Sequence, residues 1–261
     1  MKIFRRIAIS FTLYSRIPMP RFEWKEDDMS SSLDFFPLVG AVIGALICLV
    51  NIGPLSTHIN PFVRAIVSVL IPILVTGGFH LDGFMDTADA LNSYGEPAKK
   101  LEILKDPHIG AFSVISLVKL ILTALASSAF ILSFDALSKE SVIVIALIFV
   151  VSRCISGLTS LFLKKAKKSG MLSKETGNRK KSSVVLLCLQ LVISAAAMLI
   201  LDPITALPAL VFFAGYTLYY KYKTKKEFGG VTGDTAGMLV SVSETGAVLA
   251  TAVMYLILRL L

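Results

Sequence analysis

The chain has 261 residues, of which 55% are hydrophobic and 17% are charged, and its mean hydropathy is +0.75. These values exclude an ordinary soluble domain and predict a single integral membrane domain over residues 1–261. The net charge is +8, which in a membrane protein reflects basic cytoplasmic loops and argues against a nucleic-acid partner. The three cysteines, Cys48, Cys154 and Cys188, all lie in apolar runs, so the sequence indicates neither disulfides nor a zinc site.

The N-terminal segment, MKIFRRIAISFTLYSRIPMP, combines a basic start with an apolar stretch from Ile7 to Tyr14. A signal peptide would show the same two features. This segment, however, has no small-residue cleavage site, and it is closed by Arg16 and two prolines. We therefore expect an amphipathic helix that lies in the membrane interface.

Apolar stretches then follow one another to the end of the chain. Each is close to the ~20 residues with which an α-helix crosses ~30 Å of hydrocarbon. Clusters of Pro, Gly and charged residues separate them. In chain order they cover residues 35–53, 62–81, 109–133, 141–163, 184–201, 204–220 and 236–258. The predicted fold class is all-α, a polytopic membrane bundle of about seven transmembrane helices.

Lysine and arginine are unevenly divided between the two sets of loops. The N-terminal segment and loops 82–108, 164–183 and 221–235 hold 21 of the 26 basic residues, and the opposite set holds two. Basic loops stay in the cytoplasm, so we expect a cytoplasmic N-terminus in a multi-pass protein of the inner or plasma membrane. We interpret the most basic loop, 164–183, as a solvated anchor facing the lipid, with attraction of substrate phosphate as the alternative.

Three carboxylates follow the second apolar stretch, in the string GFHLDGFMDTADAL. Asp82, Asp86 and Asp89 are spaced i, i+4, i+7, which places them within about 60° of one another on a helix. Their repulsion near a bilayer is costly unless a cation neutralises it, and hard oxygen ligands suit Mg²⁺ or Mn²⁺. The cluster therefore predicts a metal, bound with a phosphorylated substrate. The alternative is the solvated end of a helix. His80 lies about 160° from Asp82, which favours a hydrogen bond to substrate over metal binding.

Two other segments on the predicted cytoplasmic side carry unusual chemistry. One is KDPHIGAF, which begins with Lys105 and Asp106. The other is GGVTGDTAG, which contains Thr232, Gly233 and a further acid, Asp234. Gly-rich backbone that leads into a helix offers free N–H groups to an anion, so we expect both segments to bind substrate; a plain tight turn is the alternative.

Three ionisable residues lie inside the predicted spans. Lys119, Arg153 and Glu244 each lie 10 to 11 residues from the cytoplasmic end of their helix, roughly 15 Å deep. An unpaired charge at that depth is expensive, so we expect a buried ion pair or a polar substrate cavity. The sequence leaves open which of the two cations Glu244 meets.

Longer strings resemble one known family along nearly the whole chain. They are FTLYSRIPMP (11–20), FFPLVGAVIGAL (35–46), GGFHLDGFMDTADAL (77–91), ILKDPHIGAF (103–112) and GGVTGDTAG (229–237), with Ser-Arg at 152–153 and Ser-Glu at 243–244. With these strings the chain resembles the cobalamin synthases, also called adenosylcobinamide-GDP ribazoletransferases. It departs from their pattern at Ala90, where Gly is expected, and at Pro107-His108, where Ser-Arg is commoner.

The resemblance implies a Mg²⁺-dependent membrane enzyme that joins adenosylcobinamide-GDP to α-ribazole or its 5′-phosphate and releases GMP. Its site would face the cytoplasm. It implies that Asp82, Asp86 and Asp89 hold Mg²⁺ on the diphosphate, and that one of them or Asp234 is the general base. The expected substrate contacts are His80, Lys105, Asp106, Arg153, Thr232, Gly233 and Glu244. The sequence leaves the oligomeric state open, a homo-oligomer included.

Two other functions remain as alternatives. A CDP-alcohol-type phosphotransferase also uses acids spaced by three residues, but its motif has Ala-Arg after the first acid pair, whereas here Thr87-Ala88-Asp89 follows Asp86. A cation-coupled transporter would place its acids near the membrane midplane, between repeated halves. The predicted acids lie at the interface instead.

Overall fold

The computed structural model describes residues 2–23, 25, 28–54, 56–134, 137–167, 170–177 and 181–261. Over these ranges the fold is helical, with one isolated bridge between Lys165 and Val231. The elements are α1 (Lys2–Tyr14), η1 (Met29–Ser31), α2 (Phe36–Ile52), α3 (Pro61–Thr76), α4 (Phe79–Asn92), α5 (Pro97–Ile103), α6 (Ala111–Leu132), α7 (Lys139–Phe162), α8 (Met171–Gly177), α9 (Lys181–Leu201), α10 (Pro203–Phe228) and α11 (Gly233–Leu260).

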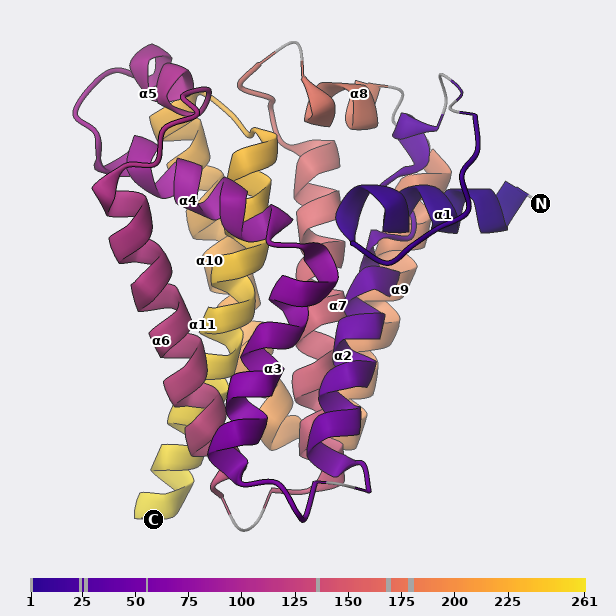
Figure 1. Ribbon diagram of the computed structural model, residues 1–261, viewed down its shortest axis with the longest axis vertical. Helices are drawn as coiled ribbons and strands as arrows, with labels where there is room; N and C mark the ends of the chain where they lie inside the picture. The colour runs from indigo at the N-terminus through magenta and orange to yellow at the C-terminus, as the bar shows by residue number, and fades with distance from the viewer. Residues whose placement is uncertain are drawn as a thin grey trace.

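The long helices stand side by side along the long axis of the molecule, and the short ones gather at one end (Figure 1). We call this the α4 end, because α4 lies across it beside α1, α5 and α8. Helix α7 is the central element, packed against α2, α9 and α11. Its middle is buried because Val144, Ile148 and Val151, spaced by three or four residues, face the same neighbours.

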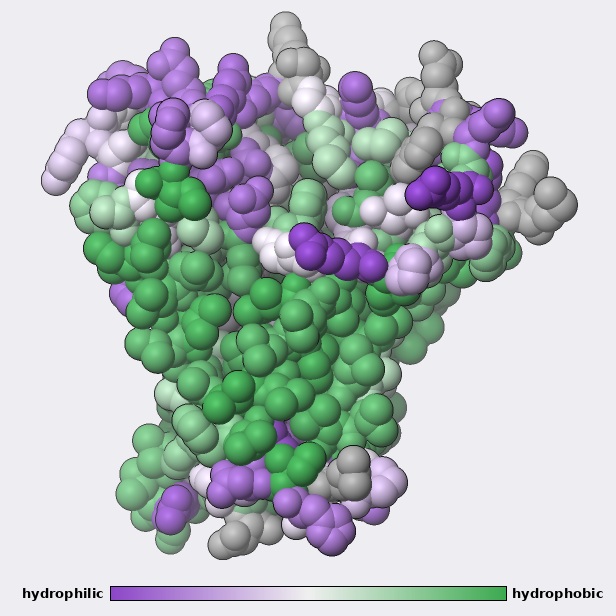
Figure 2. All heavy atoms as spheres, viewed as in Figure 1, coloured by the Kyte–Doolittle hydropathy of each residue, from purple (hydrophilic) through white to green (hydrophobic). Residues whose placement is uncertain are grey.

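On the face that Figure 2 shows, apolar side chains form a band across the bundle, and polar side chains lie at both ends. Helices α6 and α9 expose most of their apolar residues. Of the apolar 18-residue stretch of each helix, 11% is buried in α6 and 17% in α9. Exposed apolar residues of α9 include Val185, Leu189 and Val192. A band of this kind is stable only in an apolar surrounding, which supports a multi-pass membrane protein.

The predicted number of seven spans is not established by helix length and composition. Five helices, α6, α7, α9, α10 and α11, are long and apolar enough to cross a membrane, and α3 with α4 would make a sixth if the bent pair is one span. Helix α2 is apolar but has 17 residues. The other predicted boundaries lie close to the observed ones, except that α10 continues from residue 220 to Phe228.

The second predicted span, 62–81, is broken rather than continuous. Helix α3 ends at Thr76, and the chain turns by 93° before α4 begins at Phe79. Gly77 and Gly78 make the turn with φ angles of 67° and 82°, a region that glycine adopts without strain. The predicted continuation of this span from residue 77 to residue 81 was therefore wrong. Two successive residues in the left-handed region cannot continue a right-handed helix.

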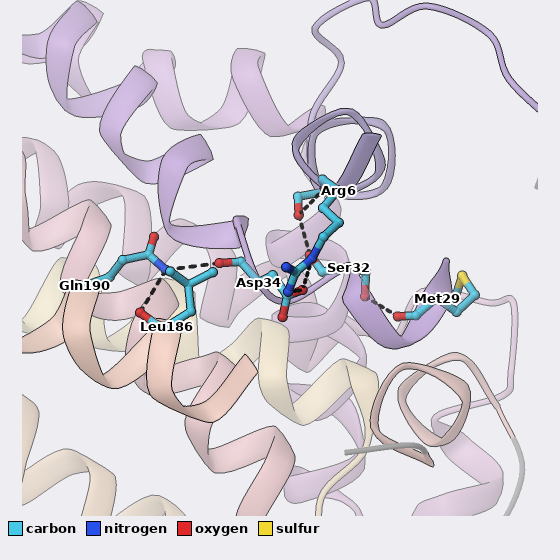
Figure 3. Close-up of polar contacts among 7 residues, drawn as sticks. Arg6, Met29, Ser32, Asp34, Leu186 and Gln190 are labelled. Atoms are coloured by element: carbon cyan, nitrogen blue, oxygen red, sulfur yellow. Dashed lines mark hydrogen bonds and ion pairs between the residues drawn. The ribbon is translucent and has the colours of Figure 1, made fainter. Parts of the chain in front are cut away.

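The N-terminal helix α1 is amphipathic, as expected, and it is tied to the α4 end by polar contacts. Ala8 and Ile9 are buried, whereas Ile3 and Phe4 are exposed. Arg6 Nε donates to the buried carboxylate of Asp34 at 2.7 Å (Figure 3). The backbone carbonyl of Asp34 in turn accepts from Gln190 of α9 at 3.0 Å (Figure 3). These contacts lock the segment before α2 between α1 and α9.

Candidate functional site

The predicted site is built where α4 crosses the first turn of α11. The crossing is close because two glycines meet there. A Cβ on Gly83 would lie 2.8 Å from the backbone oxygen of Asp234, and a Cβ on Gly237 would lie 2.9 Å from the backbone oxygen of His80. Gly237 therefore serves helix packing, and the contact brings Asp234 to the acids of α4.

Negative charge accumulates at this crossing without a cation that pairs with it among the described residues. Asp82 is exposed and Asp86 is half-buried. Burial, followed by repulsion from Asp82, Asp234 and Asp89, raises the pKa of Asp86 to about 6. The acids of α4 and Asp234 are thus electrostatically coupled at Asp86, although no three acids, imidazoles or thiols of the described residues lie close enough together to hold a metal ion.

One of the four acids has a second task. The two carboxylate oxygens of Asp89 accept from the backbone N–H groups of Gly110, at 2.7 Å, and Ser113, at 2.9 Å. These groups belong to the N-terminus of α6, whose first N–H groups have no partner within the helix. Asp89 therefore caps α6 from a neighbouring helix, in addition to its predicted metal role, which stays a prediction.

The Gly-rich segment before α11 forms a cap. Thr232 Oγ1 accepts from the N–H of Thr235 at 3.1 Å, and Thr235 Oγ1 accepts from the N–H of Thr232 at 2.9 Å. This reciprocal pair uses two of the donors that the sequence assigned to an anion. Gly233 follows the cap as the first residue of α11.

The basic loop after α7 is fastened to the segment before α11. The N–H of Val231 donates to the carbonyl of Lys164 at 2.8 Å, and the N–H of Ala166 donates to the carbonyl of Val231 at 3.0 Å. The bridge brings Lys167 within electrostatic range of Asp234. Part of the loop interpreted as a lipid-facing anchor thus lies beside the acids.

Lys105 and Asp106 lie apart from the acids in the contacts of the described residues. Both are exposed in the turn between α5 and α6. Asp106 accepts from the N–H of His108 at 2.9 Å and lies 2.6 Å from its Nδ1. The prediction that they contact substrate stays a prediction.

The buried pair predicted inside the bundle is present, and its cation is Arg153. Its Nη1 lies 2.5 Å from Glu244 Oε1, which also accepts from Ser152 at 2.6 Å. Lys119 is exposed on α6. The Nε and Nη2 atoms of Arg153 are buried without a hydrogen-bond partner among the described residues, at the wall of a largely apolar cavity of about 120 Å³. The expected ion pair is therefore present, whereas the cavity beside it is largely apolar and is not the polar cavity given as the alternative.

His80 lies at the α4 end of that cavity and also lines a second pocket, of about 50 Å³. Its ring packs against Phe36 and Phe79, and its Nε2 is buried without a partner among the described residues. Burial, followed by the charge of Arg153, holds the pKa of His80 well below its usual range. The imidazole is therefore neutral at physiological pH.

The second pocket contains a buried acid that the sequence analysis did not single out. Glu175 of α8 is 5% exposed and accepts from the hydroxyl of Tyr14 at 2.6 Å. Burial raises the pKa of Glu175, opposed by hydrogen bonds from Tyr14 and Ser32. In the sequence Glu175 is one acid within a strongly basic loop, and nothing local distinguishes it from a solvated residue.

Comparisons with known proteins agree on one family. The family model described as cobalamin-5-phosphate synthase matches residues 6–252. A protein of Lachnoclostridium phytofermentans named adenosylcobinamide-GDP ribazoletransferase is 37% identical over 97% of this chain and 95% of its own length. Proteins with the same name are 32% identical in Clostridium perfringens, over 95% and 98%, and 30% identical in Shewanella piezotolerans, over 91% and 90%. No solved structure matches the chain.

Proposed function

This chain belongs to the cobalamin-5-phosphate synthase family, and from that membership we propose that it joins adenosylcobinamide-GDP to α-ribazole or its 5′-phosphate and releases GMP. The observation that carries the proposal within the molecule is the crossing of α4 and α11. Asp82, Asp86 and Asp234 form an electrostatically coupled cluster there, beside Lys167. A diphosphate bound with a cation fits such a mixture of acids and a lysine.

The transfer forms one P–O bond and breaks one. The ribose 3′-hydroxyl of α-ribazole attacks the phosphorus attached to cobinamide, and the bond from that phosphorus to the bridging oxygen breaks. The electron pair leaves with GMP, and the hydroxyl proton passes to a carboxylate. We assign this proton to one of the acids at the crossing, Asp82, Asp86 or Asp234, because the carboxylate of Asp89 already accepts two backbone N–H groups.

The donor set fits Mg²⁺. Carboxylate oxygens are the ligands that this ion prefers, and it typically takes one or two of them and completes its shell with phosphate oxygens and water. Within the described residues no three acids, imidazoles or thiols already converge as a metal centre, which agrees with a shell completed by the substrate. We propose Asp82 and Asp86 as the ligands, with Asp234 and Asp89 beside them. When bound, the ion would neutralise charge that develops on the diphosphate.

Orientation also supports a site on the cytoplasmic side. The α4 end carries the segments with most of the basic residues, including the loop of Lys164 and Lys167. By the positive-inside rule we place this end in the cytoplasm and the protein in the inner or plasma membrane. A transporter would need its acids at mid-depth, whereas these lie at one end of the bundle.

The proposal is tested by turnover. Purified protein in lipid is incubated with adenosylcobinamide-GDP, α-ribazole and Mg²⁺, and GMP is measured against a control without enzyme. We expect GMP release that stops when a chelator removes Mg²⁺. A parallel reaction with α-ribazole 5′-phosphate compares the two acceptors. If GMP does not exceed the control with either acceptor, the proposed reaction is wrong.

A further inference from the structure

The pocket of Glu175 lies beside the acid crossing and has no role in the chemistry described so far. Its wall includes Gly233, the residue before Asp234, together with Tyr14, His80, Ser156 and Glu175. The pocket therefore lies next to the acids, because the residue that follows Gly233 in α11 is Asp234. Its free space of about 50 Å³ is several times the ~10–15 Å³ that one water needs, which suits the edge of a flat ring rather than a whole nucleoside.

Two buried polar groups in this pocket are incompletely matched. Among the described residues no Lys or Arg forms an ion pair with Glu175, whose partners are hydroxyl groups. His80 is also buried, with 6% of its surface exposed, and its Nε2 has no hydrogen-bond partner among the described residues. Buried groups of this kind are costly unless a partner arrives, so the pocket needs a ligand that donates to a carboxylate and bonds to an imidazole nitrogen.

Aromatic rings surround these two groups. Tyr14 lies 4.3 Å from Phe36 and 6.1 Å from Phe79, measured between ring centroids, and His80 lies 5.5 Å from each of the same two phenylalanines. Such walls bind a flat aromatic ring by stacking. The ligand is therefore an aromatic heterocycle with N–H donors on one edge.

We propose that this pocket binds the guanine base of the nucleotide substrate, with Glu175 accepting from guanine N1–H and the 2-amino group and His80 Nε2–H donating to O6. The inference rests on the proposed function, whose substrates carry three aromatic bases: guanine, the benzimidazole of α-ribazole and the adenine of the adenosyl group. The benzimidazole has no N–H donor for a carboxylate, and adenine has only its 6-amino group beside an accepting ring nitrogen, whereas guanine presents two donors in parallel. With the base in the pocket, its ribose passes Gly233 and the phosphates reach Asp234 and Lys167.

The test is nucleotide binding without turnover. Protein in lipid nanodiscs with Mg²⁺ is titrated with GMP, IMP, AMP and XMP by calorimetry. IMP lacks the 2-amino group, so we expect it to bind roughly ten- to hundredfold more weakly than GMP, because one charge-assisted hydrogen bond is lost. We expect AMP to bind more weakly still, because its 6-amino group would face the N–H of His80, and both groups are donors. If the intact protein binds GMP and IMP equally, the inference is wrong, and this comparison needs no variant.

The variant Glu175→Gln gives a more specific test of the base preference. A glutamine accepts from N1–H but donates to the 2-position, where xanthine carries an oxygen, so we expect the preference to change from GMP to XMP. Glu140→Gln, an exposed glutamate in the first turn of α7 at the opposite end of the bundle, is the matched control and should keep the preference for GMP. If the Glu175→Gln protein prefers GMP over XMP to the same extent as the intact protein, the assignment is wrong.

A second variant fills the pocket while Glu175 stays. Met171 lines it from α8 and is 37% exposed, so Met171→Trp adds bulk at a site that tolerates it. We expect GMP binding at least tenfold weaker, and unchanged GMP binding would contradict the assignment. The outcomes separate the two proposals. Turnover with no base preference overturns the guanine pocket alone, and base preference without turnover overturns the proposed reaction alone.

Discussion

Asp86 has the most distinctive surroundings of the residues at the α4–α11 crossing. Burial and three acidic neighbours raise its pKa to about 6, so negative charge gathers there without an ion pair to it among the described residues. Asp89 shows how an acid on the same helix face can have structural partners, because it caps α6. A shared face therefore does not mean a shared role.

Asp86→Asn removes one charge from the cluster with little change in volume. We expect a folded, inserted protein whose turnover at saturating Mg²⁺ falls by a hundredfold or more, since the loss of a metal-binding charge costs several kcal/mol of transition-state stabilisation. GMP release and a thermal melt are measured on the same preparation. Turnover within about threefold of the unaltered protein would remove Asp86 from the metal site.

Arg153 and Glu244 form a pair whose energetics can be separated by a double-mutant cycle. Removal of one partner strands the other in the bundle, so Arg153→Met or Glu244→Gln alone should cost roughly 3–5 kcal/mol of stability. Arg153→Met combined with Glu244→Leu should recover most of it, because Ser152 keeps the carbonyl of Phe149 as a partner at 3.1 Å. Thermal midpoints of the four proteins are compared. Additive losses would mean that the two side chains act independently.

At the scale of elements, the site depends on how closely α4 and α11 approach each other. A Cβ at Gly83 would lie 2.8 Å from the backbone oxygen of Asp234, and a backbone oxygen cannot rotate out of the way. Helix α4 is also oriented by the turn at Gly77 and Gly78, which directs it across the bundle instead of through it. The positions of the acids are thus set by glycines that carry no chemistry.

Gly83→Ala should therefore force the helices apart. We expect a stability loss of about 1–3 kcal/mol from overpacking, and a fall in turnover larger than that loss explains, because Asp234 moves away from Asp86. Gly215→Ala on α10 is the matched control. A Cβ there meets no atom of the described residues within 4 Å, so the protein should gain about 0.5–1 kcal/mol and keep its activity. Equal activity in the two variants would show that the approach of α4 to α11 is not required.

At the scale of the whole molecule, apolar side chains lie between two polar ends on the face that Figure 2 shows. Helix α4, the start of α11 and helix α8, which carry the acids and Glu175, all lie at one end (Figure 1). The proposed site thus lies at one end of the apolar band, which is one side of the membrane in the orientation that we propose. Substrates that are charged and water-soluble need not cross the bilayer to reach it.

Reporter fusions test this orientation. Fusions after Ser93, Glu175 and Lys225, at the α4 end, should report cytoplasm, because the adjoining loops carry most of the Lys and Arg. Fusions after Ser56 and Ser138, at the opposite end, should report the outside. The readout is alkaline phosphatase against a cytoplasmic fluorescent protein at each site. A cytoplasmic signal at Ser138 would contradict the predicted seven spans, because α6 and α7 would then not cross the membrane.

The sequence alone determined the helical membrane class, the amphipathic helix α1, the shared helix face of three acids on α4 and the pairing of Glu244 with a basic residue. These features are local. Apolar length, helical spacing and the cost of a charge in hydrocarbon act within a single segment, and they can be read from it.

The tertiary structure decided what depends on contacts between distant segments. It turned residues 79–92 across the bundle, gave Asp89 a partner 21 residues away, brought Asp234 to Asp86, and chose Arg153 over Lys119 for Glu244. It also buried Glu175 against Tyr14, 161 residues earlier in the chain. Such meetings follow from how helices pack and where glycines let them touch, and no spacing within one segment encodes them.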